Sequence, residues 1–270
     1  VGDVMELNVP YVPVERGEKC LEVKDITAID RNKVHILDHI SFDLYAGEIL
    51  GVAGIAGSGQ KELCEGIAGL YHLKSGEIIF EGENIVGKNP EKISQMGISL
   101  SFVPEDRLGM GLVGNMDLSD NMMLRTFRKG HSFFTDRKSP RRIAENVVKE
   151  LEVATPSLST PIRRLSGGNV QKVLVGREIA TAPSVLMTAY AVRGLDINTS
   201  YTIYNLLTEQ KMKGVAVVYV GEDLDVLLEL CDRIVVLCGG QVSGVVDGRT
   251  TNKMEVGALM TRMGGGKADE

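Results

Sequence analysis

The pattern of hydrophobic and polar positions predicts a chain in which strands alternate with helices. Apolar and polar residues alternate with a period of two at residues 20–26 and 40–44, which predicts two antiparallel strands joined by a polar turn. Further along, apolar residues form short and nearly continuous runs, a pattern typical of strands buried on both faces of a sheet. These runs lie at residues 49–53, 98–104, 185–189, 215–220 and 233–237.

Helical spacing and turn residues occupy the intervals between these strands. The segment from residue 108 to residue 164 differs from the rest, because glycines punctuate its start and an amphipathic helix closes it. We interpret it as a helical insert between two core strands. The predicted helices lie at residues 62–70, 121–127, 139–151 and 252–263, a hairpin at residues 75–82 and a late strand at residues 241–246.

A glycine-rich turn joins the first buried strand to the first helix. Strand, glycine-rich turn and helix form the context of a phosphate-binding loop, whose consensus is G-x-x-x-x-G-K-[ST]. Gly54 and Gly59 fit this consensus, but Gln60 stands at the lysine position and Lys61 at the Ser/Thr position. Gln60 has no positive charge for the phosphates, and Lys61 has no hydroxyl for Mg²⁺ and is expected to point away from the loop. We therefore expect a degenerate loop that binds nucleotide weakly or not at all. Its residues are Gly54, Gly57, Ser58, Gly59, Gln60, Lys61 and Glu62.

A second glycine-rich stretch, at residues 165–171, runs into another helix. Ser166 can cap this helix, and Gly167 and Gly168 leave the backbone amides at its start uncovered. Such amides attract an anion, because the first N–H groups of a helix lack partners and the helix dipole adds partial positive charge. Taken alone, the stretch favours a capped helix that binds nothing.

Composition and charge narrow the function classes. The net charge is −6 and no long block of lysine and arginine occurs, which disfavours a nucleic-acid binder. No apolar run approaches the ~20 residues needed to cross a bilayer, so membrane contact is expected through a partner. The cysteines and histidines are scattered and form no C-x-x-C pair, so we expect reduced core thiols in the cytosol and no metal cluster.

The string Leu165-Ser166-Gly167-Gly168-Asn169-Val170-Gln171 resembles the signature loop of ATP-binding-cassette (ABC) transporter ATPases. Landmarks on both sides fall in that family's order. R-G-L-D at residues 193–196 matches the family's turn, and V-P-E-D-R at residues 103–107 resembles the second ATPase half of bacterial importers for ribose-type sugars and nucleosides. The resemblance implies the P-loop NTPase fold of ABC ATPases, with a mostly parallel central sheet, an antiparallel β subdomain and a helical subdomain. It also implies ATP and Mg²⁺, at a site shared with a partner half.

The same resemblance implies that several positions have lost the side chain that their chemistry needs. The family carries a glutamine that contacts the metal and the attacking water at the position of Glu105. Its metal-binding aspartate and catalytic glutamate are replaced by Ala189 and Tyr190, and its switch histidine by Glu222. The loop after the first strand lacks the aromatic that stacks on adenine. We therefore expect no catalytic residue in the chain's own site.

The signature loop, in contrast, is retained. ABC domains pair head to tail, so that the signature loop of one covers the ATP held by the other. The resemblance implies that this chain completes such a site in trans by presenting amides and a hydroxyl to the γ-phosphate. The expected signature residues are Leu165, Ser166, Gly167, Gly168 and Gln171, and the expected dimer-seam residues are Gly194, Leu195 and Asp196.

The expected domain organisation follows the extent of the resemblance. Residues 1–19 are interpreted as a linker or edge extension, residues 20–262 as the nucleotide-binding domain with a helical subdomain at about 108–182, and residues 263–270 as a flexible tail. The chain does not begin with methionine, and both its ends resemble the ends of tandem ATPase halves. We therefore expect a C-terminal half cut from a two-domain polypeptide.

The implied partners are the preceding ATPase half, integral-membrane permease subunits and, indirectly, a substrate-binding protein. The surface around residues 105–127 is the expected permease contact. The chain would lie at the cytoplasmic face of the plasma membrane and help to drive uptake of a sugar or nucleoside, with little ATPase activity of its own. The alternative is a non-catalytic structural or regulatory cassette that docks on the permease. A soluble ABC protein of DNA repair or translation is disfavoured by the acidic balance and the absence of coiled-coil heptads.

Overall fold

The computed structural model describes residues 11–95, 100–126 and 136–262. Within these residues, a four-stranded antiparallel sheet has the order β2-β1-β4-β5. Its strands are β1 (Lys19–Ile29), β2 (His35–Tyr45), β4 (Ser75–Phe80) and β5 (Glu83–Asn84). The period-two pattern of the sequence marked the first two of these strands, and their antiparallel pairing is confirmed.

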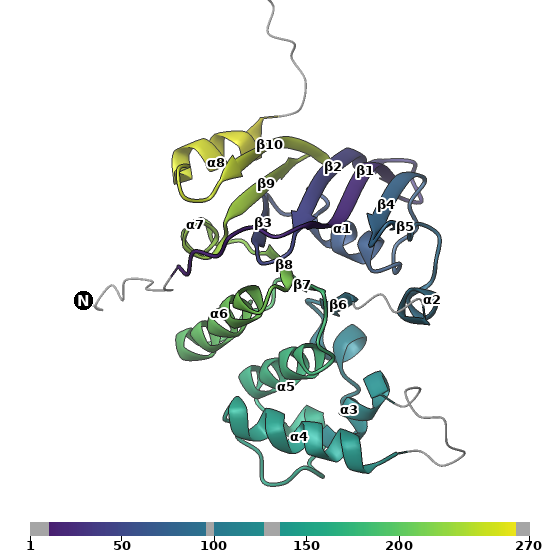
Figure 1. Cartoon of the computed structure of the whole chain (residues 1–270), viewed down its shortest axis with the longest axis vertical. Helices are drawn as coiled ribbons and strands as arrows, with labels where there is room; N and C mark the ends of the chain where they lie inside the picture. The colour runs from purple at the N-terminus through teal and green to yellow at the C-terminus, as the bar shows by residue number, and fades with distance from the viewer. Residues whose placement is uncertain (1–10, 96–99, 127–135, 263–270) are drawn as a thin grey trace, which may run out of the picture.

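A second sheet forms the centre of the molecule (Figure 1). In the described part of the chain it has six strands in the order β10-β9-β3-β8-β7-β6, all parallel except the antiparallel edge pair of β10 and β9. The strands are β3 (Ile49–Gly54), β6 (Leu100–Val103), β7 (Val185–Ala189), β8 (Ala216–Val220), β9 (Arg233–Cys238) and β10 (Gln241–Asp247). The predicted mostly parallel central sheet is thus confirmed.

Helices and the antiparallel sheet cover the two faces of this sheet. Ile49 and Val217 face one side and pack with residues of α5 (Gly167–Ile179), α6 (Ile197–Met212), α7 (Leu224–Leu230) and α8 (Lys253–Thr261). Leu50 and Val218 face the other side and pack with α1 (Gln60–Ile67) and with the antiparallel sheet. Burial on both faces is the reason that these strands read as continuous apolar runs.

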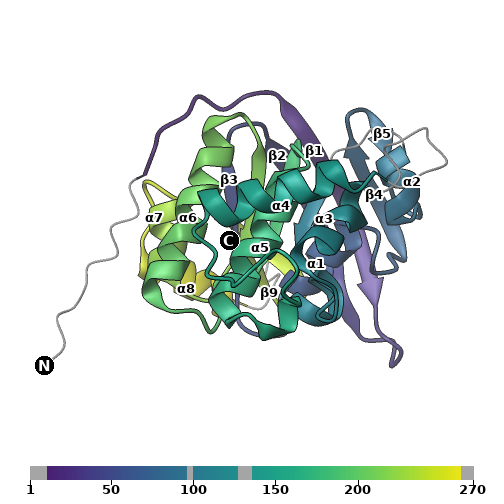
Figure 2. The same cartoon turned by 90° about the horizontal axis from the view of Figure 1, so that it is seen from below.

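The helical subdomain lies at one end of the molecule. Figure 1 shows α3 (Leu118–Thr126) and α4 (Lys138–Glu150) gathered below α5, and Figure 2 views this helical face directly. Their side chains join the same hydrophobic core as α5, through residues such as Met122 and Val147. A π-helical turn, η1 (Arg107–Gly111), connects β6 to this region, and a 3₁₀ turn, η2 (Ile162–Arg164), precedes the signature loop.

Several predicted boundaries need correction. The first helix begins at Gln60, two residues earlier than predicted, so Gln60 and Lys61 are both helical. The hairpin predicted at residues 75–82 turns later, because β5 follows residue 82. The pattern of apolar and polar residues did not predict α2 (Pro90–Gln95), η1, α6 or α7. The predicted tail at residues 263–270 and the first ten residues lie outside the described residues, so the proposed domain limits remain predictions.

Candidate functional site

The carboxyl ends of four parallel strands meet at one edge of the central sheet. β3 leads into the phosphate loop, β6 into Glu105, β7 into Tyr190 and β8 into Glu222. Parallel strands all point the same way, so the loops that follow them lie side by side, where α/β folds place their ligands. Tyr190 also donates its backbone N–H to the carbonyl of Val220, at a distance of 3.0 Å, which ties the ends of β7 and β8 together.

The phosphate loop has the backbone of a phosphate cradle. Gly57 and Gly59 have φ angles of 85° and 96°, which favour glycine, and a Cβ on Gly59 would lie 2.6 Å from the carbonyl oxygen of Ile36. The side chain of Gln60 is buried, and its Nε2 donates to the carbonyl of Ile55 at 3.1 Å. The neutral amide of Gln60 is therefore bonded to the loop's own backbone.

Lys61 does not take over the missing charge. Its ammonium lies 3.8 Å from Glu65, one turn further along α1, and 46% of its side chain is exposed. The helix thus directs Lys61 toward Glu65, in the arrangement of an i,i+4 ion pair. This geometry agrees with the expectation that Lys61 points away from the loop.

The surroundings of the loop are acidic. Burial, together with the charges of Glu222, Glu105 and Glu62, raises the pKa of Tyr190 to about 12. Arg193 faces this group: it lies 2.6 Å from Glu105 and 3.8 Å from Glu222, with its guanidinium 6.0 Å from the centre of the Tyr190 ring. Arg193 thus pairs with Glu105 and Glu222, which stand where the family resemblance implies contacts with the metal and the γ-phosphate.

These residues do not fit a Mg²⁺–ATP complex. Ala189 has no ligand atom, the pKa of Tyr190 keeps its hydroxyl protonated at neutral pH, and Glu222 would face the γ-phosphate as a like charge. In the described parts of the chain, no group of three or more His, Cys, Asp or Glu could hold a metal ion.

The signature loop, residues 165–171, is held in place by a helix cap. Ser166 is the N-cap of α5; its Oγ accepts from the backbone N–H of Asn169 at 3.4 Å and from Asn169 Nδ2 at 2.9 Å. Asn169 Oδ1 in turn accepts from the backbone of Ala154 at 2.9 Å, which fixes the loop to the segment after α4. Ser166 and Gly167 are exposed. The loop is therefore held by hydrogen bonds on both sides and lies at the surface at the start of α5.

The signature loop packs directly on the turn that precedes α6. A Cβ on Gly168 would lie 3.0 Å from Thr199 Oγ1 and 3.6 Å from Asp196 Oδ2. Asp196 caps α6, since its carboxylate accepts from the backbone N–H of Thr199 at 2.9 Å and from Thr199 Oγ1 at 2.7 Å. These two hydrogen bonds hold the pKa of Asp196 below its ordinary value, and the bond from the backbone N–H of Thr199 has the larger effect. The structure thus brings Gly168 and Asp196 together, while Gly194 and Leu195 lie in the turn just before them.

Two arginines, Arg107 and Arg193, connect the signature helix α5 to the carboxylate of Glu105. Neither arginine had a role predicted from the sequence. Arg107 Nε donates to Gln171 Oε1 at 2.7 Å, and Arg107 Nη2 donates to the backbone carbonyl of Arg193. Arg193 in turn pairs with Glu105. Both arginines lie within the quoted strings V-P-E-D-R and R-G-L-D, so the motifs marked the residues but not their contacts.

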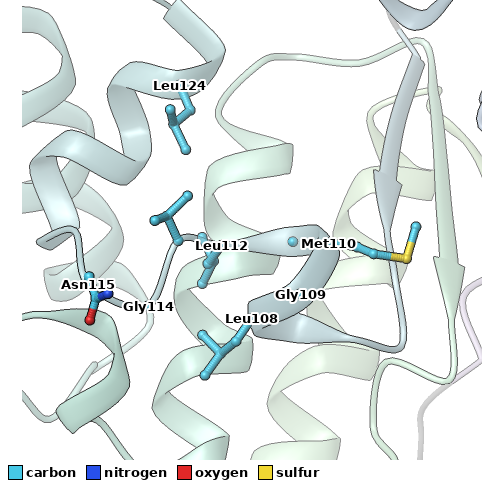
Figure 3. A pocket seen from close by; sticks show the side chains of 9 residues that line it. Leu108, Gly109, Met110, Leu112, Gly114, Asn115 and Leu124 are labelled. Carbon is cyan, nitrogen blue, oxygen red and sulfur yellow. The ribbon is translucent and has the colours of Figure 1, made fainter.

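A hollow of about 440 Å³ opens beside η1, lined by the segment after Arg107 and by Leu124 of α3 (Figure 3). Figure 3 shows Leu108, Leu112 and Leu124 around it. Leu108, Met110 and Val113 are all more than 40% exposed in this segment. A short stretch of chain therefore presents several apolar side chains to the surface beside a hollow, which is typical of a site for another protein.

Comparisons with known proteins show the family of the chain. The family model described as ABC transporter matches residues 37–188. The xylose import ATP-binding protein of Moorella thermoacetica is 36% identical over 99% of this chain and 53% of the relative. The guanosine import ATP-binding protein of Bacillus subtilis is 34% identical over 100% of this chain and 54% of the relative. The chain thus spans about half the length of the curated relatives it matches.

Solved structures show the same fold. A dimeric ATP-binding cassette in a post-hydrolysis state, bound to ADP and Pi, has a TM-score of 0.75 at 21% identity and covers 86% of this chain and 100% of its own. An ATP-binding cassette in its ADP conformation has a TM-score of 0.70 at 20% identity, over 90% of this chain and 95% of its own. The predicted fold class, with its two sheets and its helical subdomain, is confirmed.

Proposed function

Because this chain belongs to the ABC transporter family, we propose that it is the second nucleotide-binding half of an ATPase that drives import of a sugar or a nucleoside. The names of its relatives, which are import ATP-binding proteins for xylose, galactose, guanosine and ribose, support this class of cargo. The match to about half of each relative supports a position as one of two halves. The same relatives do not favour a purely structural cassette.

The chain's own site is impaired in this proposal. The observation that carries it is the pairing of Arg193 with Glu105 and Glu222, beside Tyr190 and a phosphate loop whose lysine position holds Gln60. An incoming triphosphate would bring about four negative charges to a pocket that already holds several carboxylates. Neither a metal ligand nor a general base is available at Ala189 and Tyr190. The isolated chain should release phosphate from ATP very slowly or not at all.

The signature loop would act on ATP that the preceding half holds. Ser166 and the amides of Gly167 and Gly168 would bind the γ-phosphate of that ATP, and Asp196 would lie at the seam between the halves. The N-cap bond to Asn169 and the packing of Gly168 on Thr199 support this role, because they fix the loop before a ligand arrives. The bound ATP would bring its Mg²⁺ from the partner's side, so this chain needs no metal ligand of its own.

The hollow beside η1 is the proposed contact with the permease. Its lining residues follow Glu105 directly, so movement of the loop after β6 would be transmitted to whatever fills the hollow. In the described residues no helix is both long and apolar enough to span a bilayer. By its family resemblance, we propose that the chain lies at the cytoplasmic face of the plasma membrane on permease subunits, and that a substrate-binding protein delivers the cargo on the opposite side.

Substitution of the signature serine tests the proposal. In the full-length ATPase with its permease, Ser166→Arg should abolish ATP hydrolysis and transport, because a bulky cation would occupy the place of the γ-phosphate contact. Ser159→Arg is the matched control, since Ser159 is an exposed serine of the same subdomain. A malachite-green assay of the isolated chain should detect no turnover. Unchanged transport in Ser166→Arg, or ordinary turnover by the isolated chain, would refute the proposal.

A further inference from the structure

Two hydrogen bonds hold the guanidinium of Arg107 beside the signature loop. Its Nε donates to Gln171 Oε1 at 2.7 Å, and its Nη2 donates to the carbonyl of Arg193. Its Nη1 lies 3.6 Å from the place that a Cβ on Gly167 would take. Gly167 is the first helical residue of α5. Arg107 therefore belongs to the loop after β6 in sequence but to the signature loop in space.

The residues that the structure describes do not balance the charge of Arg107. No carboxylate pairs with it among the residues that the structure describes, and burial alone lowers its pKa. The guanidinium nonetheless remains protonated at neutral pH. It also lies beside the N-terminus of α5, which carries partial positive charge from the helix dipole. Arg107 is partly buried and Gly167 is exposed, so an anion can reach this place from solvent and would be attracted by both positive groups.

Gln171 supplies a second and independent sign of a missing ligand. Its side chain is fully buried, and its Oε1 must face Arg107 because Arg107 can only donate. Its Nε2 then has no hydrogen-bond acceptor within residues 11–95, 100–126 and 136–262. Gln171 lies four residues after Gly167 on the same face of α5, and helical side chains lean toward the N-terminus of their helix. A buried donor without an acceptor thus lies below the same end of α5.

We propose that Arg107 is a second phosphate-contacting group of the signature site, which donates an N–H and positive charge to the terminal phosphate of the ATP held by the partner half. The proposal rests on the function proposed above and adds a residue to that site. Arg107 takes no proton in this role; it stabilises negative charge as that charge develops on the phosphate. Gln171 and the Arg193 carbonyl orient its guanidinium, which explains why Arg107 forms no ion pair of its own in the described chain.

The test uses the full-length ATPase with its permease, and measures kcat, KM and inhibition by orthovanadate with Mg²⁺–ADP, an analogue of the transferring phosphate. Arg107→Gln removes the charge and should lower kcat about 10- to 100-fold, the effect of one charge-assisted hydrogen bond. The inhibition constant for vanadate should rise by a similar factor, because the lost contact serves the transition state. Arg107→Lys keeps the charge and should lose less. Arg141→Gln is the control, since it removes an exposed charge of the same subdomain.

Three results would overturn the inference. If Ser166→Arg abolishes activity while Arg107→Gln leaves kcat and vanadate inhibition unchanged, the proposal for Arg107 fails and the proposed function stands. If the Gln and Lys variants lose kcat equally with unchanged vanadate inhibition, Arg107 only packs against the loop. If Ser166→Arg stays active, both proposals fail together. Thermal unfolding checks that each variant is folded, and should Arg107→Gln not fold, the vanadate inhibition of Arg107→Lys decides.

Discussion

Replacing Gly168 by alanine tests how the signature loop is packed. The added Cβ would lie 3.0 Å from Thr199 Oγ1 and 3.3 Å from Thr199 Cγ2, closer than an ordinary van der Waals contact. Overpacking at such a position costs about 1–3 kcal/mol, whereas replacing a helical glycine by alanine gains up to about 1 kcal/mol. We therefore expect Gly168→Ala to lower the free energy of unfolding by about 1 kcal/mol, which corresponds to a fall in Tm of about 2–4 °C for a chain of this size.

Gly167→Ala is the matched control. The nearest atom to its added Cβ is Arg107 Nη1, the end of a long side chain, at the ordinary contact distance of 3.6 Å. This variant should therefore be as stable as the parent chain or slightly more stable. The two glycines are neighbours in the same helical turn, so any difference between the variants reports on their surroundings rather than on helix propensity.

A double-mutant cycle tests whether Thr199 is responsible for the cost of Gly168→Ala. Thr199→Ala removes both atoms that crowd the Cβ at position 168, so the cost of Gly168→Ala should be smaller in that background. Urea unfolding of the four variants, followed by circular dichroism, gives the four free energies of unfolding. The reasoning is refuted if Gly168→Ala is no less stable than the parent, or if its cost is unchanged when Thr199 is alanine.

Three further predictions concern stability and the phosphate loop. Lys211→Met should lower the free energy of unfolding by about 3–5 kcal/mol, because the Lys211 side chain is 1% exposed and pairs with Asp232 at 2.7 Å. Urea unfolding measures this change, and Lys213→Met, at an exposed lysine, is the control that should change the free energy of unfolding little. Because the folded-state pKa of Asp196 lies below its ordinary value, its stabilising effect is present above the unfolded pKa of about 3.9 and is lost as pH falls through the folded value. Asp196→Asn should therefore lose less stability than the parent between pH 5 and pH 2, and an equal loss would contradict the assignment. Gln60→Lys should not restore ATP binding in equilibrium dialysis, because Glu105 and Glu222 remain and no metal ligand is added; saturable binding would contradict this.

The sequence predicted those parts of the fold in which burial is uniform. The strands around residues 49–53 and 185–189 are apolar throughout because both of their faces are covered, and the resulting runs are hard to mistake. The helix α6 was missed because polar residues lie on its buried face. Thr208, Gln210 and Lys211 are all buried there, so the apolar periodicity that marks a helix is weak.

In the candidate site, too, the sequence predicted some features and not others. Local motifs identified the phosphate loop and the signature loop, because each is a short string with its own backbone chemistry. The contacts of Arg107 with Gln171 and of Arg193 with Glu105 join residues 64 and 88 positions apart, which no spacing rule relates. η1 was also missed, since a π-helical turn rich in glycine has no apolar period. Motifs thus located the two loops, and only the fold showed how arginines link them.

The central claim is that this chain's own pocket does not hold Mg²⁺–ATP while its signature loop remains intact. Isothermal titration of the 270-residue chain with Mg²⁺–ATP tests the first part without any partner. The account predicts no saturable heat up to about 1 mM ATP. A one-site isotherm with a Kd in the low micromolar range, lost when Gly59 is replaced by valine, would contradict it.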